Sequence, residues 1–356
     1  MTVMGEDYRF SSEFNEKMSV PTRKIVRALS ENARISISEL SKILNLSRRT
    51  TKERMLKVEK ELGIRYTLEL NEEALGLTNP HIIAVKFARE PDYGEVSEIL
   101  SGSHMPQIVM KARGNYDLLI YANAANRMDY VFWDKTTQVR LAKYGVQWQT
   151  SGVAFIHLGF CPIRNALIEK LDLPEKYKSM LLLLNENSRL SFHEISQKLG
   201  MHFNTVAYNF NKLVKMGYIK RFTIVVSKPP ETTTIAMFGK YTISEGFEEA
   251  SMKMRKEISW IDDDMPLISR YPFSIQLLGS YDFFFAGIYD NEKVGYDKLI
   301  KYYKNTYKKQ NVKVAYATLQ DTLLGDFPLR NVNSKKEFNM IRWIPDSQPV
   351  VTRPFA

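Results

Sequence analysis

The chain has 356 residues, 44% of them hydrophobic and 25% charged, which is typical of a globular protein with more than one domain. Its formal net charge of +10 favours an anionic partner such as nucleic acid. The single cysteine, Cys161, excludes an intrachain disulfide and a multi-thiolate zinc site. The longest nearly apolar stretch, Phe283–Tyr289, is far shorter than the ~20 residues of a membrane-spanning helix. The N-terminal segment carries acidic residues early and has no apolar core, so we predict a cytoplasmic protein without a secretory signal or a membrane partner.

The sequence contains two copies of one segment. Residues Glu31–Ile64 align without a gap on Glu186–Ile219, at an offset of 155 and with 11 identities in 34 positions. A second pair follows in the same order, a Gly-Asn-Tyr-Asp sequence that begins at Gly114 and a Gly-Ser-Tyr-Asp sequence that begins at Gly279. Two matches in one order predict a tandem duplication.

Each copy of the first segment predicts three short helices. The middle helix begins at Ser36 or Ser191, where a Glu three residues later completes a capping box. It ends before Asn45 or Gly200, residues that tolerate a left-handed backbone. A longer helix with one apolar face follows, and the preceding helix is expected at Lys24–Ser30 and Lys178–Leu184. This is the helix-turn-helix arrangement.

Strands are expected after each set of three helices. The runs Ile64–Leu70 and Ile219–Val226 predict a strand or small wing that closes a winged helix. The rest of each half follows the order strand-helix-strand-strand-helix-strand, the ferredoxin-like motif. In the first half we expect Ile82–Ala88, Asp92–Leu100, Gln107–Arg113, Asp117–Asn123, Arg127–Lys143 and Val146–Leu158. In the second half we expect Thr234–Thr242, Gly246–Ser259, Ser274–Leu278, Asp282–Tyr289, Val294–Lys309 and Val312–Leu319.

The fold class is therefore α+β, with two winged helix-turn-helix domains and two ferredoxin-like domains in tandem. The expected divisions are an N-terminal tail (1–19), winged helix-turn-helix 1 (20–72), ferredoxin-like domain 1 (78–160), a linker (161–173), winged helix-turn-helix 2 (174–228), ferredoxin-like domain 2 (231–323) and a C-terminal tail (324–356).

These motifs resemble the Lrp/AsnC (feast/famine) transcription regulators, which combine an N-terminal winged helix-turn-helix with a ferredoxin-like ligand-sensing domain. The resemblance covers about Pro21 to Asp321 and departs from the usual single-copy form. It is carried by Asn32 to Ser36, Glu39 to Ser41, Leu46, Ser47, Arg54 and Gly114 to Asp117 in copy one, and by Asn187 to Ser191, Glu194 to Ser196 and Gly279 to Asp282 in copy two.

The third helix of copy one is the candidate for contact with base edges in the major groove. Paired arginines suit bidentate recognition of guanine, whereas Ser and Thr suit phosphate oxygens. A solvated basic face is the alternative, and Arg54 has a second interpretation as a brace between helix and wing. The predicted DNA-binding residues here are Ser47, Arg48, Arg49, Thr50, Lys52, Arg54 and Lys57, with Glu53 beside them.

Copy two has fewer cations at the equivalent helix. Asn is suited to bidentate recognition of adenine, whereas Phe203 and Tyr208 leave open a protein-contact surface. The two heads are therefore expected to bind unlike half-sites of an asymmetric operator. The predicted DNA-binding residues are His202, Asn204, Thr205, Tyr208, Lys212, Lys220 and Arg221, and Asn209 is a further candidate on the same helix.

The Gly-x-Tyr-Asp sequences have two interpretations. Glycine allows a tight reversal between antiparallel strands and aspartate binds the N–H groups of turns, which accounts for both copies structurally. The family resemblance implies an amino-acid-like effector at Gly114, Tyr116, Asp117, Gly279, Tyr281 and Asp282. It also implies that the two sensing domains pair sheet against sheet within one chain, as an intrachain pseudo-dimer that can assemble further into a homo-oligomer.

Other clusters give weaker signals. The lysines of residues 298–313 predict a solvated face, with flanking DNA contact as the alternative, and Asp262–Asp264 predicts a solvated loop. The five histidines show no metal-ligand spacing, so no metal or cofactor is expected. Trp343 and Phe355 in the tail suggest an arm that docks on a neighbour.

The sequence thus predicts a non-enzymatic transcription regulator that binds double-stranded DNA. The alternative enzyme class is a sirohaem decarboxylase, which has the same architecture, but its His-Asn-Tyr segment is not found around His81, His104 or His157. A regulator whose second head binds protein is a third interpretation.

Overall fold

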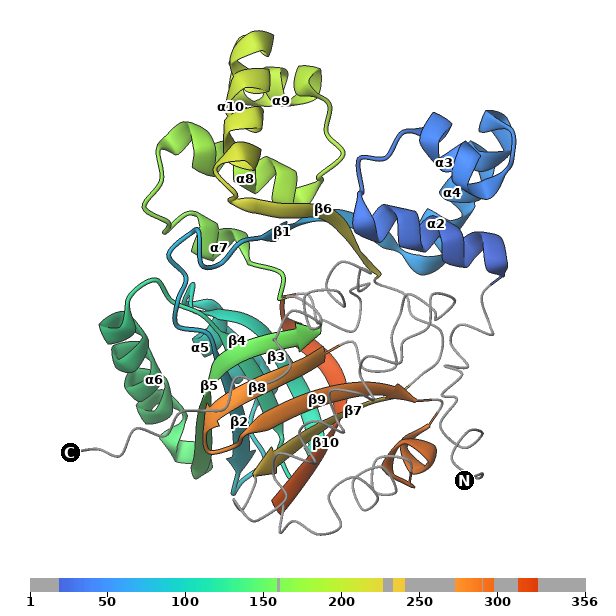
Figure 1. Ribbon diagram of the computed structural model, residues 1–356. Helices are drawn as coiled ribbons and strands as arrows, with labels where there is room; N and C mark the ends of the chain where they lie inside the picture. Colours follow the sequence, from blue (N-terminus) through green and yellow to red (C-terminus); the bar gives the residue numbers. More distant parts are fainter. Residues whose placement is uncertain are drawn as a thin grey trace, which may run out of the picture.

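The computed structural model describes residues 19–158, 161–226, 233–240, 273–289, 291–297 and 313–325. Figure 1 shows two small helical heads on the same side of a β-barrel, with a two-stranded ribbon between them. Head one consists of α2–α4 and head two of α8–α10, and the two heads come from the two copies of the repeated segment. Within the described ranges, no helix has the length and apolar character needed to cross a membrane.

Capping explains where the helices of head one begin and end. The Ser36 hydroxyl accepts from Glu39 N at 3.1 Å, and Glu39 Oε2 accepts from Ser36 N at 3.0 Å, so the expected capping box is confirmed. Asn45 follows α3 with a φ of 53°, and Ser47 caps α4 by accepting from Thr50 N at 3.1 Å. The helices are α2 (Val20–Glu31), α3 (Ile37–Leu44) and α4 (Arg48–Leu62).

Head two repeats this local structure. Ser191 and Glu194 form the second capping box, with Ser191 Oγ accepting from Glu194 N at 3.2 Å. Gly200 provides the left-handed residue of the turn, with a φ of 62°. The helices are α8 (Glu175–Glu186), α9 (Phe192–Leu199) and α10 (Phe203–Lys215). Both copies therefore have the predicted helix-turn-helix.

The strand that follows each head does not form a wing. β1 (Ile64–Leu70) and β6 (Ile219–Val226) pair with each other in antiparallel orientation, with Ile64 opposite Val226 and Leu70 opposite Ile219. The strands were predicted correctly, but the expectation that each closes its own head as a wing is wrong. The alternation of side chains indicates which face of a strand is buried, and it does not identify the strand that pairs with it.

The ribbon belongs to the cores of both heads. Ile224 and Val226, from copy two, are buried among the apolar residues of head one. Leu68 and Leu70, from copy one, are buried among those of head two. Each head therefore completes its core with a segment of the other copy.

The other eight described strands close a single barrel. β5 (Val146–Leu158) pairs with β8 (Phe273–Gly279), and β10 (Lys313–Leu324) pairs with β3 (Pro106–Gly114), so the two halves meet at two seams. The order around the barrel is β10-β3-β4-β2-β5-β8-β9-β7. The remaining strands are β2 (His81–Phe87), β4 (Leu118–Ala122), β7 (Thr233–Lys240) and β9 (Phe283–Tyr289). The halves do pair within the chain, but the expectation of two separate sheets packed face to face is corrected, because strand edges join them.

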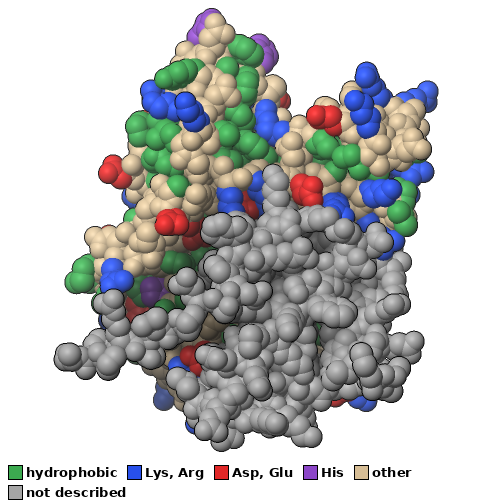
Figure 2. Space-filling view, viewed as in Figure 1, with side chains coloured by type: hydrophobic (Ala, Val, Ile, Leu, Met, Phe, Trp, Pro, Cys, Tyr) green, Lys and Arg blue, Asp and Glu red, His purple; other side chains and the backbone are tan. Residues whose placement is uncertain are grey.

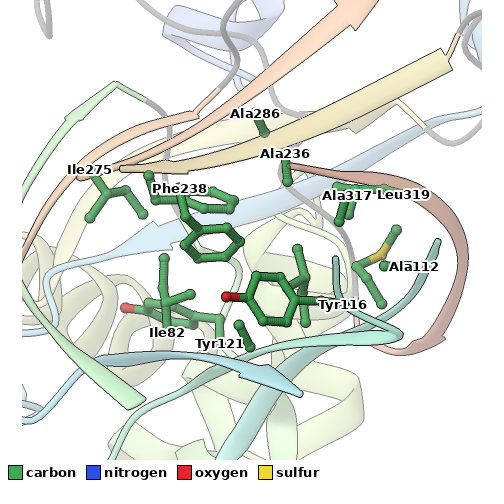
Figure 3. Packing of buried hydrophobic residues seen from close by; sticks show 14 of the residues in the cluster. Ile82, Ala112, Tyr116, Tyr121, Ala236, Phe238, Ile275, Ala286, Ala317 and Leu319 are labelled. Atoms are coloured by element: carbon green, nitrogen blue, oxygen red, sulfur yellow. The ribbon is translucent and has the colours of Figure 1, made fainter. Parts of the chain in front are cut away.

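Apolar side chains of both halves meet inside the barrel, as Figure 3 shows. Tyr116 from the first half and Phe238 from the second lie edge to face, with ring centroids 5.5 Å apart. In the first half, α5 (Tyr93–Ser101) and α6 (Arg127–Leu141) lie on the outside of the barrel and cover a second core that includes Trp133. The short helices η1 (Ala142–Tyr144) and α7 (Asn165–Ile168) complete the described elements.

Several expected features lie outside the described residues. These are the helix at Gly246–Ser259, the acidic run Asp262–Asp264, most of the helix at Val294–Lys309 with its lysines, and most of both tails. Of the second of these helices, residues 292–297 are described and helical.

Candidate DNA-binding interface

The predicted residues of copy one lie together on α4 and the turn before it. Thr51, Met55, Val58 and Leu62 form the buried face of this helix. Six of the seven candidates are exposed, and the seventh is half-buried: Ser47, Arg48, Arg49, Lys52, Arg54 and Lys57, with Thr50. The apolar face therefore holds α4 against head one and leaves its polar side chains facing solvent.

The charge of α4 suits a polyanion. The helix carries six basic and three acidic residues, and Arg49 forms an ion pair with Glu53 at 3.1 Å. Because these two side chains are 90% and 63% exposed, the pair is worth only ~0.2–1 kcal/mol and can be exchanged for a nucleic-acid contact. Figure 2 shows Lys and Arg side chains gathered at the end of head one that points away from the barrel.

The N-terminus of α4 is also suited to an anion. Arg48 and Arg49 occupy the first two helical positions after the Ser47 cap, where helix N-termini favour phosphate. Arg54 is exposed on α4, so the described structure does not bury it against β1 as a brace.

The candidates of copy two divide into an exposed and a buried group. His202 caps α10 by accepting from Asn204 N at 3.3 Å, and Tyr208 is 63% exposed. Thr205 and Lys212 are also exposed, and a hydrogen bond that Lys212 donates to the Tyr177 side chain raises the pKa of Lys212. α10 carries two lysines and no acidic residue, so its charge is smaller than that of α4.

Asn209 is 1% exposed on the inner side of α10 and therefore cannot contact DNA. Its equivalent in copy one, Arg54, is exposed, and the sequence alignment alone does not reveal this difference in burial.

Lys220 and Arg221 require a second correction. Both lie in β6 within the ribbon, and both form ion pairs with the Glu69 carboxylate of β1. The Arg221 side chain is 11% exposed and Glu69 is 4% exposed, so this arginine serves the contact between the heads. Lys220 keeps 44% of its side chain exposed but is drawn toward the same carboxylate. The prediction that these two belong to a wing of head two is wrong, because β6 pairs with β1 of the other copy in the ribbon between the heads.

The Gly-x-Tyr-Asp turns lie at the seams of the barrel. The Tyr116 and Tyr281 hydroxyls contact each other, which brings the two copies of the motif together. Tyr116 Oη also donates to Gln149 Oε1 at 2.8 Å. The predicted effector residues are thus placed on both sides of one shared centre, as an intrachain pseudo-dimer requires.

Each of the two aspartates of these turns forms an ion pair with a lysine. Lys86 Nζ lies 2.7 Å from Asp117 Oδ1, and Lys240 Nζ lies 3.1 Å from Asp282 Oδ1. The same lysines donate to the carbonyl oxygens of Gly114 and Gly279 at 3.2 and 2.7 Å. These contacts give the turns a structural role in both copies, and the effector role stays a prediction.

The glycines of these turns allow close approach across the seams. Gly114 has a φ of 127°, and a Cβ atom there would lie 2.9 Å from the Tyr316 carbonyl oxygen of β10. Gly279 has a φ of 129°, and a Cβ atom there would lie 3.1 Å from the Thr150 carbonyl oxygen of β5. A side chain would therefore strain the turn and push the seam apart.

Sequence reasoning did not identify Glu72, which follows β1. Its carboxylate accepts from Tyr121 Oη at 3.0 Å and from Asn123 Nδ2, and burial raises the pKa of Glu72 to about 7. The local sequence contains no signal for this group, because its partners are on β4 and after it.

The roles of Arg34 and Arg189 were missed as well. Both are identities of the repeat, at an offset of 155, and both bind the opposite head. Their repetition was the available signal.

Comparisons with known proteins find helix-turn-helix domains in both copies. A model of the AsnC-type helix-turn-helix domain matches residues 23–59, and a model of a winged helix-turn-helix DNA-binding domain matches residues 178–220. An uncharacterized HTH-type transcriptional regulator of Pyrococcus abyssi is 32% identical over 108 residues, which are 30% of this chain and 73% of that protein. Another from Pyrococcus furiosus is 32% identical over 109 residues, 30% of this chain and 72% of that protein.

The fold and the exposed helices therefore define a helix-turn-helix DNA-binding protein. The chain belongs to the Lrp/AsnC family of transcription regulators.

The fold of the whole chain has a precedent among solved structures. The siroheme decarboxylase NirDL aligns over 90% of this chain and 97% of its own, with a TM-score of 0.57 and 14% identity. At this identity the likeness shows the shared fold.

Proposed function

We propose that this regulator binds an asymmetric double-stranded DNA site, with α4 in one major groove and α10 in the next. The observation that carries the proposal is the difference between two equivalent helices. Arg48 and Arg49 at the start of α4 correspond to Phe203 and Asn204 at the start of α10. Heads with unlike side chains at the same position favour unlike base pairs.

On α4 the roles follow from the chemistry of the side chains. Arg48 and Arg49 are proposed to contact guanine edges, whereas Ser47 and Thr50 are proposed to contact phosphate oxygens. Lys52, Arg54 and Lys57 add the sequence-independent attraction that makes binding depend on salt.

On α10 the proposed contacts depend less on charge than those of α4 and more on hydrogen bonds to base edges. Asn204 is proposed to contact an adenine edge, with His202, Thr205 and Tyr208 close to it in the sequence at the start of α10. Lys212 is the proposed phosphate contact of this head. Lys220 and Arg221 leave the proposed set because they bind Glu69.

An amino-acid-like effector is part of the proposal only at the Gly-x-Tyr-Asp turns. Because Lys86 and Lys240 occupy the Asp117 and Asp282 carboxylates, an ammonium group would have to displace a lysine there. We therefore expect an effector to act by loosening the seams of the barrel.

The test is selection from a random DNA pool, followed by affinity measurements at two salt concentrations. Arg48→Ala and Arg49→Ala should each cost ~1–3 kcal/mol on the selected site and relax the preference at one or two base pairs. Lys57→Ala should lower affinity uniformly and flatten the salt dependence. The matched control is Lys24→Ala, which removes an exposed charge from α2.

Three outcomes would contradict the proposal. A selected site with strict palindromic symmetry would show that the two heads are equivalent on DNA. Failure to enrich any sequence, together with saturable binding of an iron porphyrin, would favour the second candidate. That candidate is a haem-pathway decarboxylase, and the observation in its favour is the fold shared with NirDL over 90% of the chain. Enrichment that survives replacement of the α10 side chains would point to head two as a protein-binding module.

A further inference from the structure

Two arginines at equivalent positions of the repeat cross between the heads. Arg34 Nη1 donates to the carbonyl oxygens of Ser188 and Leu190 in head two, at 2.6 and 2.9 Å. In return, Arg189 Nη2 donates to the carbonyl oxygen of Ile35 in head one, at 3.4 Å. Each arginine therefore binds the backbone next to the other, which makes the contact reciprocal.

Aromatic rings surround the Arg34 side chain where it contacts head two. The Arg34 guanidinium carbon lies 5.8, 5.1 and 5.6 Å from the ring centroids of Phe192, Phe210 and Phe222. These distances are within the range of cation–π attraction, which strengthens when the cation is partly buried. A lysine would fit this place less well, because its compact ammonium is strongly hydrated, whereas the weakly hydrated planar guanidinium can stack on the rings while Nη1 donates to the two carbonyl groups.

The side of head one is less aromatic. Arg189 lies 5.0 Å from the Tyr66 ring centroid and donates to Tyr66 Oη at 3.3 Å. The positions equivalent to the three phenylalanines are Ile37, Met55 and Thr67. Arg34 is therefore expected to hold the heads together more strongly than Arg189.

This arrangement has an electrostatic cost. Two like charges lie near each other at the centre of the contact, and burial and the charge of Arg189 lower the pKa of Arg34. A contact needed only for stability is served at least as well by apolar side chains. The directional bonds of the two guanidinium groups add what apolar packing lacks, which is a fixed orientation of one head relative to the other.

The ribbon alone gives weaker control of that orientation. A two-stranded ribbon twists easily, and β1 and β6 carry the whole strand pairing between the heads in the described structure. The crossing arginines brace it from both sides, so that α4 and α10 move as one body. Because neighbouring major grooves on one face of DNA are ~34–36 Å apart, a rigid pair of heads accepts few separations of half-sites.

We infer that Arg34, with Arg189, is a positioning residue that fixes the separation of α4 and α10, so that the protein selects DNA by the spacing of its half-sites. This inference rests on the proposed binding of both helices to DNA. It assigns spacing selectivity to residues that touch no nucleic acid.

The first measurement needs no DNA. Spin labels at Lys60→Cys and Lys215→Cys, equivalent exposed positions on α4 and α10, report the separation of the heads in the full chain with Cys161→Ala. We expect a narrow distance distribution for the parent protein and for Lys24→Ala. Arg34→Ala should broaden it clearly, and Arg34→Lys should broaden it nearly as much although it keeps the charge. A narrow distribution in a folded Arg34→Lys variant would overturn the inference.

The second measurement varies the spacer between the selected half-sites by up to about three base pairs in either direction. The parent should lose ~10-fold or more in affinity away from its best spacing, because rigid linkage raises the effective concentration at one geometry only. Arg34→Lys should reduce this discrimination to ~3-fold or less. Its affinity for an isolated α4 half-site should stay unchanged.

The two proposals can fail separately. A broadened distance distribution with unchanged spacing preference would overturn the role of Arg34 in selectivity and leave DNA binding intact. Failure to enrich any DNA would overturn the proposed function, and spacing selection with it, even if the label distances broaden as expected.

Discussion

Glu72 illustrates how a single side chain can acquire unusual chemistry from distant residues. It lies just after the ribbon, where it accepts hydrogen bonds from Tyr121 and Asn123 of the barrel. Burial outweighs these bonds and raises the pKa of Glu72 to about 7. The carboxyl group is therefore protonated in the folded protein at a pH at which the unfolded chain has already lost that proton.

We predict that this group makes stability fall as pH rises. Between about pH 4.5 and pH 7 the folded state binds more protons at Glu72 than the unfolded state, so the free energy of unfolding decreases with increasing pH. The loss should approach ~3 kcal/mol above pH 7 as an upper bound. Glu72→Gln keeps an oxygen acceptor and should remove this part of the pH dependence.

The measurement is urea unfolding from about pH 5 to pH 8 for the parent and for Glu72→Gln. Glu73→Gln, an exposed neighbour, is the matched control and should follow the parent. A Glu72→Gln curve parallel to that of the parent would show that Glu72 does not titrate in this range.

At the scale of elements, each strand of the ribbon contributes to the cores of both heads. Thr223 Oγ1 of β6 donates to the Ser30 carbonyl oxygen of head one at 2.9 Å, and Thr67 Oγ1 of β1 donates to the Asn185 carbonyl oxygen of head two at 2.9 Å. Each strand is thus divided between two cores. The helices of one copy are completed by the strand of the other.

This division predicts opposite effects of two substitutions on one strand. Ile224 is buried in the core of head one, and Ile219, five residues earlier, is buried in that of head two. Ile224→Ala should destabilise head one by ~2–4 kcal/mol, whereas Ile219→Ala should destabilise head two by a similar amount. Hydrogen exchange should accordingly increase in α2–α4 for the first variant and in α8–α10 for the second.

The two variants serve as controls for each other. If both increased exchange only in α8–α10, β6 would belong to its own head in solution, as a conventional wing does.

At the scale of the whole molecule, the two halves complete one barrel. The edges of the first half, β3 and β5, are covered by β10 and β8 of the second half. Uncovered strand edges are prone to pair with any available strand. The closed barrel leaves no such edge among its described strands.

We predict that residues 1–160 and 161–356 associate when they are produced together as separate chains. The expected product is a complex with one copy of each, because both seams and both shared cores then form. Each fragment produced alone should self-associate or precipitate through its open edges. Light scattering after gel filtration measures the mass of each species.

Two monomeric fragments that coexist without binding would contradict this prediction. That result would mean that the seams contribute little and that the covalent linkage alone keeps the halves together.

The sequence by itself determined the features that depend on nearby residues. The capping boxes at Ser36 and Ser191 and the left-handed turns at Asn45 and Gly200 are set by contacts within a few positions, so the repeat predicts them twice. The exposed candidates of α4 follow from helical periodicity in the same way.

The tertiary structure alone decided which distant edges meet. Strand β6 pairs with β1, and Arg221 forms an ion pair with Glu69 in place of the predicted contact with DNA. Arg34 of head one donates hydrogen bonds to the backbone of head two. Periodicity in a sequence specifies which face of an element is buried, but the choice of partner depends on the free energy of the whole assembly. For that reason the heads were predictable from the chain, and the ribbon and arginine contacts that connect them were not.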